Sequence, residues 1–246
     1  YFANDVAYHM DKVDRNYKNL VNVLGADHTG YIKRITAAVS ALSDNKILLN
    51  CKVCQLVKLF KNGKPFKMSK RAGEFISVQD LLNEVDKDPI RFMMLNRSND
   101  VELDFDFDKV KEKTKDNPVF YVQYAFARIN SLLRILNISL NSEIKLNEEN
   151  FELNANEEKI IRKIFEWPKI IESVSKKYEI HKIPFYLYEL STLFHSYWSK
   201  GNEDKKYKFI ENDKIKRIEI LVIINLISIV IQNGMKILGV SLPKKM

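Results

Sequence analysis

The sequence predicts an α/β region followed by an all-α bundle. Segments typical of strands and helices alternate up to about residue 110, as in layered α/β structure. From residue 117 to the end, apolar residues recur at the three- and four-residue steps of amphipathic helices. Gly (7) and Pro (6) are scarce among the 246 residues, which favours ordered helical structure over disorder. We therefore place one domain over residues 1–110 and a second over residues 111–246.

The first domain begins with a short strand at residues 20–24 (LVNVL), which leads into a loop and then a helix near residues 30–42. A second strand is expected over residues 48–61. Asn62-Gly63 supplies the two positive-φ residues of a tight hairpin turn, after which residues 64–67 return. Residues 68–74 have no apolar period and are expected to form an exposed loop.

Two helix starts follow this loop. Ser77, with Asp80 three residues later, predicts an N-capped helix over residues 77–85. Asp88-Pro89 predicts another, with Pro at its first helical position. Residues 102–108 alternate apolar and acidic side chains, which indicates one short strand or an extended linker.

The second domain begins with a helix capped by Asn117-Pro118. Further helices are expected near residues 155–178, 184–199 and 213–238. Gly239 lies where a helix end is expected. The polar residues 137–154 are expected to form a surface loop.

The long apolar run Ile220–Ile231 lies between the charged residues Glu219 and Lys236. The 16 residues between these charges would span about 24 Å as a helix, less than the ~30 Å core of a bilayer. We expect a buried helix and no membrane partner.

Positive charge is concentrated in the second domain. The net charge is +8, and residues 1–110 hold 17 basic against 15 acidic side chains, whereas residues 111–246 hold 23 against 17. This excess indicates a polyanionic partner, nucleic acid before membrane. A general lysine-rich composition is the alternative explanation.

The two cysteines, Cys51 and Cys54, form a lone C-x-x-C. Residues three apart on a strand point to opposite faces, which is poor geometry for a shared ion, so we expect reduced thiols and no protein-bound metal. No signal peptide is visible, and a cytoplasmic location is expected.

Two segments carry candidate chemistry. The basic loop Lys67–Arg71 (KMSKR) could close over a triphosphate, because compact, rotatable ammonium groups stabilise charge that develops on pyrophosphate. Such strings are also common on ordinary surfaces. The loop Gly25–Gly30 follows the C-terminal end of a predicted parallel strand, where α/β sheets bind ligands. Its Asp27 could hold a ribose hydroxyl or a cationic group, although an ordinary strand–helix turn has the same pattern.

The sequence resembles the arginyl-tRNA synthetases of bacterial type, which are class I enzymes, in five segments along nearly the whole chain. These are Tyr1–His9 (YFANDVAYH), Gly25–Tyr31 (GADHTGY), Lys67–Gly73 (KMSKRAG), Asp116–Arg128 (DNPVFYVQYAFAR) and Leu238–Met246 (LGVSLPKKM). The resemblance implies the C-terminal portion of such an enzyme. Residues 1–110 would be the C-terminal half of a class I Rossmann-like nucleotide-binding domain, and residues 111–246 a helical anticodon-binding domain.

The resemblance implies a two-step ligation, in which arginine and ATP give arginyl-adenylate and pyrophosphate, and the arginyl group then passes to tRNA(Arg). Mg²⁺ would accompany the ATP substrate. The implied residues are Lys67 and Lys70 for catalysis, Gly25, His28, Lys67, Met68, Ser69 and Lys70 for ATP, and Tyr1, Asp5 and Asp27 for arginine. A carboxylate suits arginine because it pairs with a planar guanidinium through two hydrogen bonds.

The resemblance also implies tRNA contacts in the helical domain, where unpaired bases need aromatic faces and basic groups. The candidates are Tyr121, Gln123, Tyr124, Arg128, Tyr197, Trp198 and Met246. Tyr124 and Tyr197 could instead be core residues, whereas Trp198 precedes a polar stretch and is expected to be partly exposed.

The HIGH-like motif of class I synthetases does not occur in these 246 residues. We therefore expect this fragment, a monomer, to be inactive alone. Two alternatives remain: another class I synthetase, or a non-catalytic module that binds tRNA through its basic helical part.

Overall fold

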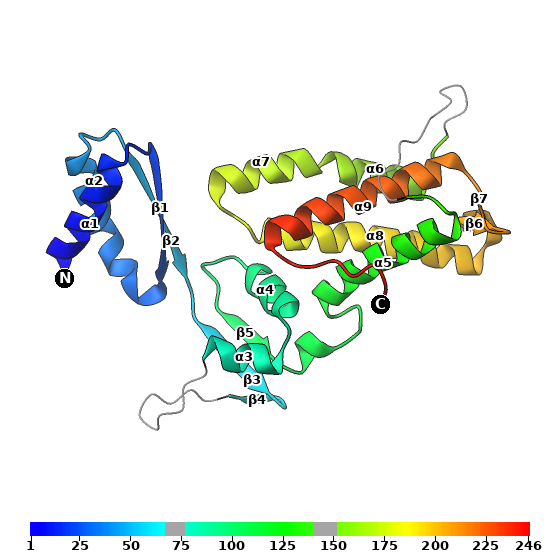
Figure 1. The fold of residues 1–246 in the computed structure, drawn as a ribbon, viewed down its shortest axis with the longest axis horizontal. Helices are drawn as coiled ribbons and strands as arrows, with labels where there is room; N and C mark the ends of the chain where they lie inside the picture. The colour runs from blue at the N-terminus through cyan, green and yellow to red at the C-terminus, as the bar shows by residue number, and fades with distance from the viewer. Residues whose placement is uncertain (67–76, 140–151) are drawn as a thin grey trace. The chain divides into compact units, whose positions relative to one another are not determined.

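The structure is a computed structural model that describes residues 1–66, 77–139 and 152–246. It forms two compact units (Figure 1). The first comprises residues 1–58 and 98–104, and the second residues 59–97 and 105–246. The units therefore divide the chain differently from the predicted domains, and the boundary at residue 110 stays a prediction.

The first unit is a β-α-β arrangement preceded by a helix. Its elements are α1 (Phe2–Asp14), β1 (Asn19–Gly25), the 3₁₀ helix η1 (Ala26–Tyr31), α2 (Ile32–Leu42) and β2 (Leu48–Cys54). β1 and β2 pair in parallel, from Asn19 opposite Leu48 to Gly25 opposite Cys54. The predicted strand, its parallel direction and the helix after it are confirmed.

One face of this two-stranded sheet packs on α2. Leu20 and Leu49 from the strands form a small core with Ile35 and Val39 of the helix. The alternation of the β1 side chains follows from the two-residue period of a strand, so Val23 points to the opposite face and is exposed. Because β1 and β2 are parallel, the segments that follow them begin at the same end of the sheet, where Gly25 pairs with Cys54.

The strand predicted over residues 48–61 is two strands, so this prediction was wrong in extent. β2 ends at Cys54 and β3 (Val57–Lys61) begins after Gln55, whose backbone N–H donates to Asn99 O at 2.8 Å. β3 lies between β4 (Lys64–Pro65) and β5 (Leu103–Asp106) in a three-stranded sheet. The short strand expected near residues 102–108 is therefore confirmed.

The turn between β3 and β4 has the expected conformation, with φ of 53° at Asn62 and 69° at Gly63. The capping box of α3 (Val78–Glu84) is also confirmed. Ser77 Oγ accepts from Asp80 N at 3.1 Å, and Asp80 Oδ2 accepts from Ser77 N at 2.8 Å.

The second unit contains a helical bundle. Its further elements are α4 (Lys87–Leu95), η2 (Lys109–Lys111), α5 (Pro118–Ile135), α6 (Ala155–Phe165), α7 (Trp167–Lys177), α8 (Lys182–Glu203), η4 (Lys205–Tyr207), β6 (Ile210–Glu211), β7 (Lys214–Ile215) and α9 (Ile218–Leu238). Two predicted extents were wrong. The helix expected over residues 155–178 is two helices, broken before Pro168, and the last helix begins at Ile218 after a β6–β7 hairpin.

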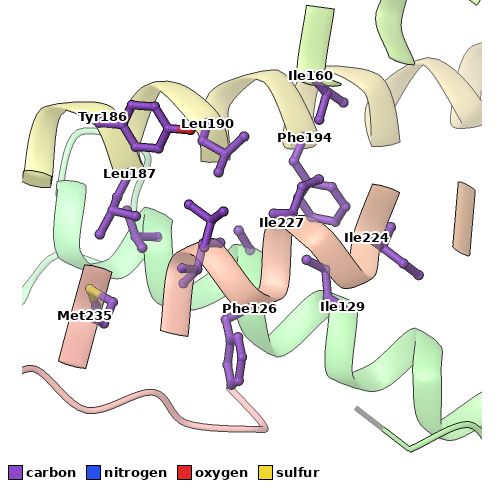
Figure 2. Close-up of a cluster of buried hydrophobic side chains, with 14 of the residues drawn as sticks. Phe126, Ile129, Ile160, Tyr186, Leu187, Leu190, Phe194, Ile224, Ile227 and Met235 are labelled. Atoms are coloured by element: carbon purple, nitrogen blue, oxygen red, sulfur yellow. The ribbon is translucent and has the colours of Figure 1, made fainter. Parts of the chain in front are cut away.

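The core of the bundle lies between α5, α6, α8 and α9 (Figure 2). Phe194 of α8 and Ile227 of α9 are fully buried there, and Ile160 of α6 packs beside them. α9 is long and apolar enough to cross a membrane by composition, yet it packs in this core, which confirms the prediction of a buried helix. It ends at Gly239, whose φ of +67° is the left-handed conformation expected there.

A buried carboxylate joins three helical segments of the bundle. Glu157, on α6, is fully buried and accepts from Tyr197 Oη at 2.7 Å and from Arg217 Nη1 at 3.0 Å. It also accepts from Asn154 N at 2.8 Å. Burial, followed by the bond to Glu157, raises the pKa of Tyr197, which therefore stays a protonated donor. The cluster ties the start of α6 to α8 and to the start of α9.

Candidate nucleic-acid interface

Two groups of predicted site residues lie in the described structure, one in each unit. In the first unit, Asp5 lies on α1 and accepts a hydrogen bond from Tyr31 Oη at 2.7 Å. Partial burial, followed by this bond, raises the pKa of Tyr31 to about 12. Tyr31, which ends the GADHTGY segment, was not predicted as a site residue.

A hydrogen-bonded chain fixes α1 on β1 and so holds Asp5 in place. His9 Nδ1 donates to the carbonyl of Asp5 at 2.7 Å, and Asn22 Nδ2 lies 2.8 Å from His9 Nε2. Lys12 Nζ donates to Asn22 Oδ1 at 2.9 Å. Since a carbonyl only accepts, His9 Nδ1 carries the proton and Nε2 accepts from Asn22.

The other predicted ligand-binding residues of this unit are exposed. The ring of Tyr1 is fully exposed, and Gly25 ends β1. Asp27 Oδ1 and His28 Nε2, on η1, lie 3.8 Å apart at the same end of the sheet. The described contacts join Asp5 to Tyr31 and do not bring it to Asp27. Lys67, Met68, Ser69 and Lys70 lie outside the described residues.

The cysteines lie on β2, as predicted, with Cys51 half-buried and Cys54 exposed. Burial raises the pKa of the Cys51 thiol. Within residues 1–66, 77–139 and 152–246, no three His, Cys, Asp or Glu side chains gather as metal ligands would.

In the second unit, α5 and α8 bring aromatic and basic side chains together around Arg128. Arg128 Nη2 donates to Tyr124 Oη at 2.6 Å, and its guanidinium carbon lies 4.4 Å from the centre of that ring. The same carbon lies 5.1 Å from the ring of Trp198. Phe120 stacks on the Tyr124 ring at 5.8 Å. The cation is therefore held between two aromatic side chains, which favours it electrostatically.

His195 completes this cluster and was not predicted as a site residue. Its Nδ1 lies 3.0 Å from Arg128 Nη1, and its Nε2 lies 3.1 Å from the carbonyl of Tyr121. Its ring lies 4.3 Å from that of Tyr121 and 5.4 Å from that of Tyr124. Burial, chiefly, lowers the pKa of His195 to about 4. The imidazole is therefore neutral near pH 7.

Two pockets meet at Arg128 and Ser131. One, of about 330 Å³, is lined also by Trp198, Phe209 and Lys208. Trp198 and Phe209 lie 5.2 Å apart with their rings at 69°. Trp198 is partly exposed, as predicted. This pocket offers aromatic faces beside two cations.

The second pocket, of about 400 Å³, is lined also by Tyr124, Arg134 and Met246. Arg134 Nη1 donates to the carbonyl of Lys244 at 2.9 Å, which holds the last residues against α5. Met246 thus lines the same pocket as Tyr124 and Arg128, two α5 residues that were predicted to contact tRNA.

Charge distinguishes these two pockets from the others described in this unit. Their lining residues include the cations Arg128, Arg134, Lys208 and Lys245 but no Asp or Glu side chain. A larger pocket of about 570 Å³ is lined by Asp86 and Asp88 with one cation, Lys87, so its lining is net acidic and suits a phosphate backbone less well. An anionic ligand with flat rings is therefore matched best by the pockets on either side of Arg128.

Three residues that were predicted to contact tRNA pack or bond within the protein. Tyr197 is 2% exposed and packs 4.8 Å from Phe209, so the core alternative describes it and its ring is not available to a base. The amide of Gln123 donates to the carbonyl of Ser241 at 3.0 Å and so holds the C-terminal segment. Tyr121 is partly buried under His195 and Tyr188, and burial raises its pKa.

The helical part of the chain matches a known protein family. Residues 122–246 match the family model of the DALR anticodon binding domain. The whole chain is 57% identical to a protein named arginine–tRNA ligase from Pelagibacter ubique (strain HTCC1062), and 48% identical to one from Roseobacter denitrificans (strain ATCC 33942 / OCh 114). It spans 43% of the length of each.

Solved structures share the fold. A crystal structure from Campylobacter jejuni, described as that of an arginyl-tRNA synthetase, superposes with a TM-score of 0.82 at 27% identity over the whole chain and 52% of its own. The Thermus thermophilus arginyl-tRNA synthetase gives 0.67 at 16% identity over 93% of this chain and 41% of its own. A methionyl-tRNA synthetase from Mycobacterium tuberculosis superposes with a TM-score of 0.54 at 12% identity, over 89% of this chain and 40% of its own. The last two likenesses show the fold alone.

Proposed function

We propose that the helical unit binds the anticodon of tRNA(Arg), since the chain belongs to the DALR anticodon binding domain family and is similar over its whole length to proteins named arginine–tRNA ligase. The observation that carries this proposal is Arg128, held between Tyr124 and Trp198 where two cation-lined pockets meet. Unpaired bases are recognised by stacking and by hydrogen bonds to their edges, and this cluster offers both.

The pocket beside Trp198 is the proposed place for one unstacked base. Trp198 and Phe209 present two rings at a steep angle, and Arg128 reaches the same space. Lys208 at its rim would neutralise a phosphate. Met246 and Arg134 would contact a neighbouring nucleotide in the second pocket.

We further propose that the chain supplies part of the arginine-activating site of its parent enzyme. Asp5, oriented by Tyr31, would bind the substrate guanidinium beside Tyr1 and Asp27. Gly25 and His28, with the segment from Lys67 to Lys70, would hold ATP. These assignments rest on the resemblance of the residues and on the position of Asp5, Asp27 and His28 in one compact unit.

The proposal is tested by the affinity of residues 1–246 for an RNA stem-loop that carries an arginine anticodon. We expect binding that weakens as salt rises, because phosphate contacts release counterions. A stem-loop with a substituted anticodon base should bind about tenfold more weakly or worse, because the new base still stacks but loses a hydrogen bond from Arg128, and a hydrogen bond to a charged group contributes roughly 1.5–3 kcal/mol.

Equal affinity for both stem-loops would contradict anticodon reading. That result would favour the alternative of a non-catalytic module that binds tRNA through charge alone. The likeness to a methionyl-tRNA synthetase does not distinguish between synthetases, since it is a likeness of fold at 12% identity.

A further inference from the structure

The guanidinium of Arg128 is fixed by two hydrogen bonds. An arginine side chain carries five N–H donors and no acceptor. One donor on Nη2 reaches Tyr124 Oη at 2.6 Å, and one on Nη1 reaches His195 Nδ1 at 3.0 Å. These two bonds set the plane and rotation of the group, and its remaining N–H donors are available to a ligand in the pockets that Arg128 lines.

The tautomer of His195 follows from its two partners. Arg128 can only donate, so Nδ1 of His195 must accept and carries no proton. The carbonyl of Tyr121 can only accept, so Nε2 carries the proton and donates to it at 3.1 Å. A neutral imidazole in this tautomer satisfies both contacts, and the lowered pKa of His195 is consistent with it.

His195 itself is firmly held. It is 5% exposed, and its ring lies 5.4 Å from Phe194 in addition to the tyrosines of α5. The imidazole therefore behaves as a fixed acceptor on α8 that points at a basic side chain of α5.

We propose that His195 is a positioning residue for anticodon recognition, whose unprotonated Nδ1 orients Arg128 toward the base. This inference rests on the proposed function and deepens it, because it names the residue that gives a flexible arginine one geometry. Arg128 touches the RNA, whereas His195 acts through Arg128. A histidine that merely fills the core would affect stability and nothing else.

Three substitutions separate these roles. In His195→Asn, the amide oxygen lies near the position of imidazole Nδ1 and can still accept from Arg128. In His195→Gln, the amide nitrogen reaches near the position of Nε2 and keeps only the bond to the carbonyl of Tyr121. His195→Phe keeps a ring but neither hydrogen bond. All three change packing, and one alone retains the acceptor for Arg128.

The measurement is the dissociation constant of each variant of residues 1–246 for the arginine-anticodon stem-loop, with the melting temperature recorded separately. We expect His195→Asn to bind within about threefold of the unsubstituted chain. His195→Gln and His195→Phe should bind about tenfold more weakly or worse, since a hydrogen bond to a charged group is lost. This order of affinities should not follow the order of melting temperatures.

The inference is overturned if all three variants bind alike, or if affinity simply follows stability. It is separable from the proposed function, because an unsubstituted chain that ignores the anticodon sequence contradicts the function before any variant is compared. If the variants do not fold, the ¹⁵N spectrum of the histidine rings of the unsubstituted chain decides. At neutral pH it should show a ring protonated at Nε2 and bonded at Nδ1, and an imidazolium or the other tautomer at His195 would overturn the inference.

Discussion

Two buried polar side chains of the helical unit, His195 and Glu157, have a hydrogen-bond partner on each of their side-chain nitrogen or oxygen atoms. His195 uses both ring nitrogens, and Glu157 uses both carboxylate oxygens. A buried polar group without a partner is costly, so each of these side chains specifies the position of its neighbours. Each contacts a residue at the pocket beside Trp198: His195 bonds to Arg128, which lines it, and Glu157 bonds to Tyr197, which precedes Trp198 in the chain.

Stability should depend on pH through His195. Burial, and the nearby Arg128, lower its pKa from 6.5 to about 4. Between these values the unfolded chain binds a proton at this ring and the folded chain does not. The contribution of this ring to the free energy of unfolding is therefore complete above pH 6.5. It is lost as the pH falls toward 4, by at most about 3 kcal/mol. Urea unfolding of the unsubstituted chain and of His195→Asn at several pH values measures it.

The difference between the two proteins isolates this group from the carboxylates, which titrate in both. The unsubstituted chain should lose more stability than His195→Asn on acidification. Parallel pH profiles would show that His195 titrates normally in the folded state.

Loss of the Glu157 carboxylate should destabilise the helical unit strongly. Glu157→Gln leaves Arg217 opposite a neutral amide and removes one acceptor from a fully buried cluster. We expect a loss of about 3 kcal/mol in the free energy of unfolding. Glu158→Gln, next along α6, removes only an exposed ion pair with Arg162 and should cost less than about 0.5 kcal/mol. Similar effects in both variants would contradict the account.

At single residues, the sequence predicted what local pattern encodes. Trp198 precedes polar residues and is partly exposed, as expected. Gln123 and His195 bond to partners 118 and 67 residues away in the chain, so no local pattern could reveal their bonds. Tyr197 is aromatic and lies at an apolar position of the helical repeat, so the sequence pattern fits a core residue as well as a base contact.

Among the helices, α8 and α9 approach closely at Gly234. A Cβ atom at this position would lie 2.8 Å from both terminal carbons of Leu187, which is fully buried. Gly234→Ala gains about 1 kcal/mol of helix propensity but overpacks the contact by about 1–3 kcal/mol. We expect a net loss of stability in thermal or urea unfolding.

The matched control lies one residue away on the exposed face of α9. Asn233→Ala has a similar gain in helix propensity and no packing cost, so it should be neutral or slightly stabilising. Stabilisation by Gly234→Ala would show that the helices can separate without loss.

Element boundaries were predictable where a local signal exists. The capping box at Ser77 and the hairpin at Asn62 formed as expected because their partners lie within three residues. Pro168 marks the start of α7 in the sequence. The apolar period runs on across it, and for that reason a single helix was predicted. The break after Cys54 had no such signal, because Gln55 bonds to Asn99 far along the chain.

For the molecule as a whole, the basic excess counted over residues 111–246 falls in the part of the chain that holds the two basic pockets. The arrangement of compact units could not be predicted, since residues 59–97 pack with the helical unit although they precede it by sequence pattern. The chain spans 43% of the length of each of the two arginine–tRNA ligases to which it was compared.

We predict that residues 1–246 alone do not catalyse arginine-dependent exchange between ATP and pyrophosphate. The HIGH-like motif that the nucleotide site of class I synthetases requires does not occur in these residues. Binding of the arginine-anticodon stem-loop by the same preparation serves as the control for folding. Measurable exchange would show that the catalytic residues present here are sufficient.

The two tryptophans of the chain provide the most direct test of anticodon binding. Trp198 lines the pocket beside Arg128, whereas Trp167, also partly buried, packs 5.1 Å from Tyr186 and lines neither pocket at Arg128. The affinity for the arginine-anticodon stem-loop should fall by about 1–3 kcal/mol in Trp198→Ala and stay unchanged in Trp167→Ala. Equal affinities in the two variants would contradict the account.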